Sequence, residues 1–119
     1  MIAFTQTIPI FRIFDVAKAK EFYVDFVGCT VDFEHRFEPG LPLYMQVSRA
    51  GLTVHLSEHH GDATPGSTAL IKMTGIDALH AELHAKGYNY LFPGIEEQPW
   101  GRVMQLLDPF GNRLRLMEG

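Results

Sequence analysis

The chain has 119 residues, 46% of them hydrophobic, which is enough for one packed domain with a single core. Ten basic against fourteen acidic residues give a formal net charge of −4, which disfavours binding to nucleic acid and mildly favours a cationic ligand or partner. The single cysteine (Cys29), the lack of a secretory signal pattern and the lack of an apolar run near the roughly 20 residues of a membrane span predict a cytoplasmic protein that does not enter a membrane.

The first half of the chain predicts a strand, a helix and three further strands. Residues 6–13 have the composition of a strand, in which Pro9 indicates a sheet edge or an unusual crossing, because proline cannot donate to a ladder. Asp15 can cap a helix whose apolar residues recur at helical spacing until Gly28 ends it. Strands are then expected over residues 30–36, 43–49 and 52–58, the last two joined by a turn at residues 50–51.

The same order of elements recurs after a polar connector at residues 59–67. A strand is expected over residues 68–74, a helix over residues 76–86, stopped by Gly87, and further strands within residues 90–118. The turn of the last hairpin is the run Asp-Pro-Phe-Gly at residues 108–111. The sequence therefore predicts one α+β domain of two βαβββ modules, about residues 1–60 and 67–119.

Alternation along three of these strands places polar side chains on the face that points away from the core. In residues 52–58 this face carries Thr53, His55 and Ser57. The corresponding faces of residues 43–49 and 112–117 carry Tyr44, Gln46 and Ser48, and Arg113, Arg115 and Met117. If the sheets curve, these faces line a groove that suits a polar organic ligand, although faces that simply meet water give the same alternation.

The repeated βαβββ order and three motifs resemble the vicinal-oxygen-chelate superfamily of glyoxalase I, extradiol dioxygenases and bleomycin resistance proteins. The motifs are Asp-Val-Ala at residues 15–17 leading to Glu-Phe-Tyr at 21–23 and Gly28, Glu-Gln-Pro-Trp-Gly-Arg at 97–102, and Leu-Asp-Pro-Phe-Gly-Asn at 107–112. The run Gln-Pro-Trp-Gly-Arg followed by Asp-Pro-x-Gly-Asn is most similar to the bleomycin resistance branch. The resemblance spans the whole chain and implies curved mixed sheets around a cavity.

The metal enzymes of this superfamily place one ligand on the first strand and one on the last strand of each module. By register these positions fall near Ile8, His55, Thr68 and Arg115. Ile8 has no donor atom, Thr68 is a poor ligand and Arg115 would repel a cation, so we expect neither a metal nor another cofactor. The alternative is a glyoxalase-like lyase or dioxygenase of unknown substrate. It would either bind a metal through His55 and the loop of His59 and His60, or act without a metal, with His55 as acid or base beside Arg115.

The resemblance also implies a homodimer whose ligand grooves lie between the subunits, with the first strand exchanged about a hinge at Pro9. Ligand contacts carried over motif by motif are Asp32, Phe33, Phe37, Trp100, Gly101 and Arg102. Tyr44 adds an aromatic face and Glu34 and Glu38 add carboxylates, while His55, Ser57 and Arg115 project from the polar strand faces.

Aromatic faces and carboxylates suit a bleomycin-type antibiotic, which combines planar rings with a cationic tail. The expected function is therefore the sequestration of such a glycopeptide without catalysis. Arg113 and Arg115 would add positive charge to the groove, so an anionic or neutral ligand stays an alternative.

Overall fold

A computed structural model describes residues 1–119 and builds two four-stranded mixed sheets, each with the strand order first-fourth-third-second. Sheet A consists of β1 (Ile10–Arg12), β4 (Leu52–Ser57), β3 (Tyr44–Arg49) and β2 (Thr30–His35). Sheet B consists of β5 (Thr68–Lys72), β8 (Arg113–Glu118), β7 (Gly101–Leu107) and β6 (Ile95–Gln98). The predicted α+β fold of two βαβββ modules is confirmed.

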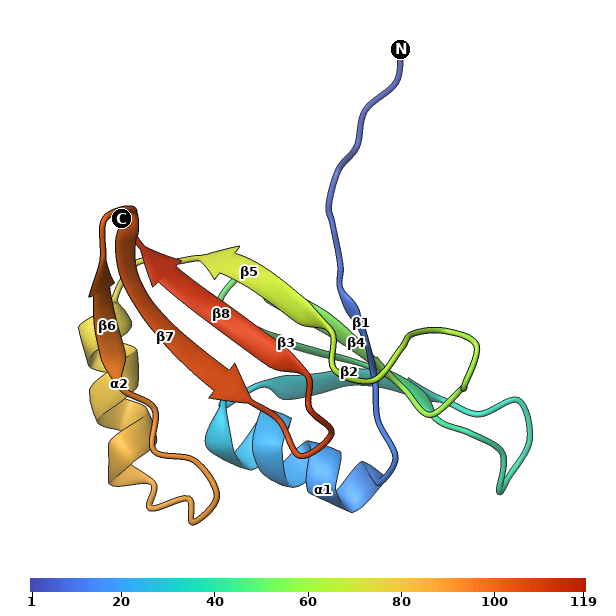
Figure 1. Ribbon diagram of the computed structural model, residues 1–119. Coiled ribbons are helices and arrows are strands. Elements are labelled where there is room, and N and C mark those ends of the chain that lie inside the picture. Colours follow the sequence, from blue (N-terminus) through green and yellow to red (C-terminus); the bar gives the residue numbers. More distant parts are fainter.

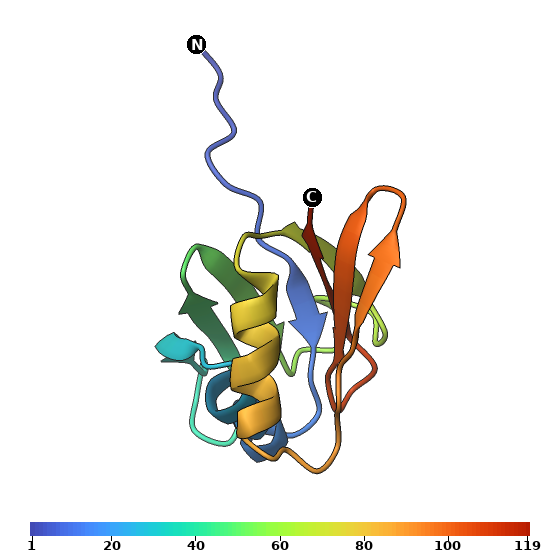
Figure 2. The ribbon, with the colours of Figure 1, turned by 90° about the vertical axis from the view of Figure 1, so that its left-hand side faces the viewer.

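Both helical segments lie on the same side of the sheets (Figure 1). In Figure 2 the helix of the second module lies in front of the strands. The first is α1 (Val16–Lys20), continued by the π-helix η1 (Glu21–Phe26), and the second is α2 (Ile76–Ala85). One cluster of buried apolar side chains joins the two modules, because it contains Phe22 and Met45 from the first and Leu83 and Leu114 from the second. None of the helices is long and apolar enough to cross a membrane.

The first helix begins and ends where the sequence predicts. Asp15 has an extended backbone (φ −152°), and its Oδ1 accepts a 2.9 Å hydrogen bond from the backbone N of Lys18. Gly28 has a φ of +88°, and a Cβ at this position would lie 2.9 Å from Nη1 of Arg49. Both a left-handed backbone and a close approach therefore require glycine where the helix stops.

The first strand is shorter than the expected residues 6–13, since β1 begins at Ile10. Ile10 pairs with His55 in the parallel ladder between β1 and β4. Pro9, the residue before β1, has no N–H to donate to this ladder, so β1 begins after it, and the residues nearer the N-terminus project from the body as an extended arm (Figure 1). Pro9 lies at the base of this arm, where its carbonyl accepts a 3.0 Å hydrogen bond from the backbone N of His55.

The last hairpin turns through the predicted Asp-Pro-Phe-Gly run. Gly111 has a φ of +86°, and Oδ1 of Asp108 accepts 2.8 Å hydrogen bonds from the backbone N of Phe110 and of Asn112. Asp108 is 4% exposed, so these bonds satisfy a carboxylate inside the protein.

Candidate functional site

The helix-free face of sheet A, called the open face from here on, carries most of the site residues predicted in the first module. Strand β3 buries Met45 and Val47 in the core, and the alternation of a strand turns Tyr44 and Gln46 to the opposite side. In the same way β4 buries Val54 and Leu56, and His55 faces out beside Tyr44 and Gln46.

An irregularity in β2 brings two neighbouring residues of this strand onto the open face. The pairing of β2 with β3 shifts between Val31 and Phe33, as it does at a β-bulge. Asp32 Oδ2 accepts a 2.9 Å hydrogen bond from Gln46 Nε2, while the ring of Phe33 meets the His55 ring edge-on at 5.8 Å. Asp32 and Phe33 therefore both border the same polar cluster.

Four side chains of the open face form one continuous chain of hydrogen bonds. The Tyr44 hydroxyl lies 2.6 Å from Nδ1 of His55, and Nε2 of His55 lies 2.9 Å from Oε1 of Gln46. Gln46 then donates to Asp32, and this hydrogen bond lowers the pKa of the Asp32 carboxyl. Burial lowers the pKa of His55 from its ordinary value of 6.5, so this imidazole is neutral at neutral pH.

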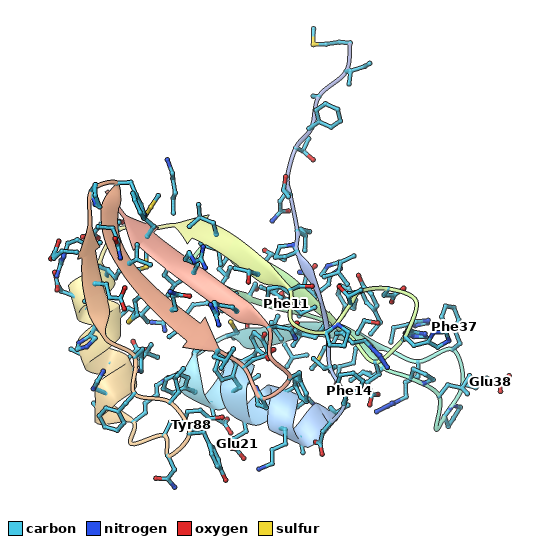
Figure 3. The ribbon with its side chains drawn as sticks, in the orientation of Figure 1. Phe11, Phe14, Glu21, Phe37, Glu38 and Tyr88 are labelled. Carbon is cyan, nitrogen blue, oxygen red and sulfur yellow. The ribbon has the colours of Figure 1, made fainter.

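Aromatic rings extend the open face towards the loop between β2 and β3. Phe37 lies in this loop at the outer end of the molecule, next to Glu38 (Figure 3). Its ring meets the rings of His35 at 4.7 Å and His59 at 6.0 Å. Phe33 is 44% exposed and Phe37 is 73% exposed, so both rings offer apolar surface on which a planar group can stack.

A cavity of about 440 Å³ lies beside the open face, between the end of β1 and the β2–β3 loop. Two arginines contribute to its lining. The Arg12 guanidinium lies 4.4 Å from the centre of the Phe14 ring, and Arg36 lies 3.8 Å from Glu58. Arg36 is thus paired with Glu58, whereas Arg12 stacks on Phe14 and its buried Nε has no hydrogen-bond partner.

The positions that hold metal ligands in related enzymes carry few donor atoms in this structure. The ladders place Ile10 opposite His55 and Leu70 opposite Arg115, so the expected Ile8 and Thr68 each lie two residues before these partners. Neither Ile10 nor Leu70 has a donor atom, and both ring nitrogens of His55 already lie within hydrogen-bond distance of a neighbour. No group of three or more His, Cys, Asp or Glu side chains is arranged to hold a metal ion.

Two other groups of histidines, in the loop after β4 and on α2, form contacts within the protein and do not belong to a group that could hold a metal ion. In the loop after β4, Asp62 accepts a 2.6 Å hydrogen bond from the Ser57 hydroxyl, which itself accepts one from the backbone N of His59. On α2, the rings of His80 and His84 are 4.1 Å apart, and Nε2 of His84 bonds the carbonyl of Pro93 at 2.6 Å.

Ser57 differs from the other predicted ligand contacts because its side chain is inaccessible. The residue is fully buried, and its two hydrogen bonds fix the loop that follows β4. Glu34 also points elsewhere: it lies on the helix side of β2, where it forms a 2.7 Å ion pair with Lys20.

The predicted contacts of the second module lie on sheet B, not beside those of the first. Trp100 is 65% exposed in the turn between β6 and β7, and Arg115 is exposed on β8. Gly101 packs against the C-terminal strand, since a Cβ there would lie 2.9 Å from the carbonyl oxygen of Glu118. One chain alone therefore divides the predicted residues between two sheets.

Arg102 binds acidic groups of its own module. Its Nη1 lies 2.6 Å from Asp77 at the start of α2, and its Nε lies 3.0 Å from Glu97 on β6. The hydrogen bonds to Asp77 and Glu97 raise the pKa of the Arg102 guanidinium, while that to Arg102 lowers the pKa of Asp77. The charge of this guanidinium is therefore already balanced by two carboxylates of the protein, without an anionic group of a ligand.

The sequence placed Gln46 on the correct face of β3 but did not show that it connects His55 with Asp32. That connection depends on the bulge in β2, for which strict alternation gives no signal. The ion pairs of Arg102 with Asp77 and Glu97 were also missed, and the only signal for them in the sequence is that acidic residues occur at these two positions.

Comparisons with known proteins agree with this architecture. The family model for glyoxalase superfamily proteins matches residues 1–119. No curated protein sequence matches the chain.

Several solved structures share the fold. A bleomycin-binding protein from bleomycin-producing Streptomyces verticillus, complexed with copper(II)-bleomycin, is 30% identical, with 100% of this chain and 99% of that chain covered and a TM-score of 0.76. The antibiotic-binding protein TnmS3 from Streptomyces sp. CB03234 is 25% identical, with 99% and 98% covered and a TM-score of 0.75. A bleomycin resistance determinant encoded on the transposon Tn5 is 20% identical, with 98% of each chain covered and a TM-score of 0.73, a likeness that shows the fold alone.

Proposed function

The chain belongs to the glyoxalase superfamily, and we propose that within it the protein binds a cationic, ring-containing antibiotic of the bleomycin type and sequesters it unchanged. The open face of sheet A carries this proposal, because it combines exposed rings with a carboxylate that no cation of the chain neutralises. The similarity to a bleomycin-binding protein at 30% identity over the whole chain supports it.

The side chains of the open face match the two parts of such a ligand. Planar heteroaromatic rings would stack on Phe33 and Phe37, whose surfaces are exposed. A cationic tail would lie near Asp32, which forms hydrogen bonds but no ion pair. Binding of this kind requires no nucleophile and no metal, in keeping with a His55 whose two ring nitrogens are already engaged.

We further propose that the working unit is a homodimer. Trp100 and Arg115 lie on sheet B, so they could join the rings of sheet A only if a second copy placed its sheet B against the open face. The N-terminal arm exposes Met1, Ile2 and Phe4, which a second copy could cover, with Pro9 as the hinge.

Some residues expected as ligand contacts take structural roles in this proposal. Ser57 fixes a loop, Gly101 allows close strand packing and Arg102 binds Asp77. The proposal places the protein in the cytoplasm, where its single cysteine, the buried Cys29, would stay reduced.

Isothermal titration calorimetry with metal-free bleomycin tests the proposal. We expect saturable binding at micromolar protein, with the drug recovered unchanged by mass spectrometry. Phe33→Ala and Asp32→Asn should each weaken binding, whereas Phe92→Ala, which removes a ring beside α2 that is even more exposed than that of Phe33, should not. Absence of binding heat, or conversion of the drug, would contradict the proposal.

A further inference from the structure

We infer that His55 determines the specificity of the open face by holding the proton of the Tyr44 hydroxyl inward. The hydrogen-bond chain through these residues then runs in a single direction, and its two ends, Tyr44 and Asp32, present hydrogen-bond acceptors to a ligand. The direction of the chain follows from the structure alone, while its consequence for a ligand rests on the proposed function.

The direction is set at Asp32. An ionised carboxylate can only accept hydrogen bonds, so the amide group that faces it at 2.9 Å must be the NH₂ of Gln46. The hydrogen bond to Gln46 also keeps the Asp32 carboxyl ionised by lowering its pKa. The carbonyl oxygen of the same amide is thereby turned the other way, towards His55.

The next link fixes the tautomer of His55. Oε1 of Gln46 can only accept, so Nε2 of His55, 2.9 Å away, must carry a proton. A neutral imidazole has a single N–H, which leaves Nδ1 as a bare acceptor. The Tyr44 hydroxyl, 2.6 Å from Nδ1, therefore donates its only proton to His55.

The two ends of this hydrogen-bond chain are the lone pairs of Tyr44 Oη and the carboxylate of Asp32, which also accepts a hydrogen bond from the Ser48 side chain. Neither can donate a hydrogen bond, so a ligand group placed here must supply the proton itself. A protonated amine, an amidine or the N–H of a heteroaromatic ring satisfies this requirement, and a carboxylate does not. The inference thus assigns the region around Tyr44 and Asp32 to a donor-bearing, cationic part of the ligand.

Protonation of His55 would reverse the last link. Nδ1–H would then donate to Tyr44 Oη, the hydroxyl proton would turn outward, and the open face would gain a positive charge. The titratable and charged groups around this pair are Asp32 and His35 on β2, Asp62 in the loop after β4, and Arg12 on β1, whose guanidinium lies over Phe14. Because burial lowers the pKa of His55, the acceptor state should dominate at neutral pH and disappear as the pH falls through that pKa.

Nitrogen NMR tests the direction of the hydrogen-bond chain without any ligand. In long-range ¹H–¹⁵N spectra at neutral pH we expect His55 in the tautomer protonated at Nε2. Asp32→Ala frees the Gln46 amide to turn and should increase the population protonated at Nδ1, whereas Glu38→Ala, which removes a carboxylate in the neighbouring loop, should leave the tautomer unchanged. A wild-type His55 protonated at Nδ1, or an unchanged tautomer in the Asp32→Ala variant, would overturn the inference.

A pair of related ligands tests its consequence for specificity. Wild type should bind bleomycin on the order of tenfold more tightly than the corresponding acid that lacks the terminal amine, and this preference should shrink between about pH 8 and pH 5. His55→Gln can preserve the direction of the chain without titrating, so it should keep the preference and lose its pH dependence, while His55→Leu should lose the preference.

The two His55 variants, tested with both ligands, also separate a positioning role of His55 from a merely structural one. An unchanged pH profile in the His55→Gln variant, or a wild type that binds both compounds equally, would overturn the inference. If neither compound binds, the proposed function fails, and the NMR spectra still decide the direction of the chain.

Discussion

The Tyr23 hydroxyl donates a 2.7 Å hydrogen bond to Oδ2 of Asp108, a residue 85 positions further along the chain. The same carboxylate accepts hydrogen bonds from the backbone and side chain of Asn112, whose amide also donates to the carbonyl of Arg12 at 2.8 Å. Asp108 and Asn112 are buried, so this polar cluster connects the helix of the first module with the last hairpin of the second.

Tyr23→Phe should therefore destabilise the protein by about 1–3 kcal/mol, because it removes a donor from a buried carboxylate and leaves the ring packing intact. Urea unfolding followed by circular dichroism measures this loss. Tyr88→Phe is the matched control, since the Tyr88 ring stacks on Phe26 at 4.6 Å and its hydroxyl makes no hydrogen bond within the protein. Equal losses in the two variants would contradict the role of the cluster.

The same hydroxyl predicts how stability changes at high pH. Burial, and next the nearby Asp108 charge, raise the pKa of Tyr23 well above its ordinary value of 10.0. The unfolded chain therefore releases this proton at a lower pH than the folded one, and the stability contributed by the neutral hydroxyl is present below pH 10 and lost above it. The free energy of unfolding should fall more steeply above pH 10 in wild type than in the Tyr23→Phe variant. If the two plots of this free energy against pH run parallel, the titration of Tyr23 does not contribute to stability.

The sequence predicted the fold well because local chemistry sets many of its boundaries. Asp15 and Gly28 delimit the first helix, and alternation put Tyr44, Gln46 and His55 on one face. The expected first strand, residues 6–13, is longer than β1, because Pro9 lacks the N–H with which the ladder to β4 would continue.

The candidate site was predictable only in part, for a related reason. Asp32 and Phe33 are adjacent, so alternation assigns them to opposite faces, and only the bulge in β2 brings both to the open face. Arg102 belongs to a motif typical of bleomycin resistance proteins, yet its guanidinium pairs with Asp77, 25 residues away, because the fold brings the start of β7 near the start of α2. A sequence motif identifies such a residue without showing which side of the sheet it occupies.

Arg102→Gln should accordingly leave the binding of bleomycin unchanged within about twofold, because the guanidinium is held by Asp77 and Glu97. Phe33→Ala in the same titration should weaken binding, since its exposed ring lies on the open face. A larger loss with Arg102→Gln than with Phe33→Ala would show that Arg102 leaves its acidic partners to contact the ligand.

Gly101→Ala should destabilise the protein by roughly 1–3 kcal/mol, through strain at a backbone position that L-residues seldom adopt. Gly101 has a φ of +150°, and a Cβ there would lie 2.9 Å from the carbonyl oxygen of Glu118, a backbone atom that cannot easily move. Gly61→Ala is the control, because a Cβ at Gly61 would meet nothing within 4 Å. Thermal unfolding compares the two, and a Gly101→Ala variant as stable as Gly61→Ala would contradict this explanation.

Removal of residues 1–8 tests whether the N-terminal arm holds two copies together. The arm exposes Ile2 and Phe4, and its base is fixed by hydrogen bonds from Gln6 to Thr53 and from the backbone of His55 to Pro9. Because the core lies outside the arm, we expect the truncated chain to keep its circular dichroism spectrum but to shift from dimer to monomer in sedimentation velocity at micromolar concentration. The double variant Ile2→Ser/Phe4→Ser, which keeps the backbone of the arm and removes its apolar side chains, should shift the equilibrium in the same direction. A full-length chain that sediments as a monomer, or a truncated chain that stays a dimer, would rule out dimerisation through the arm.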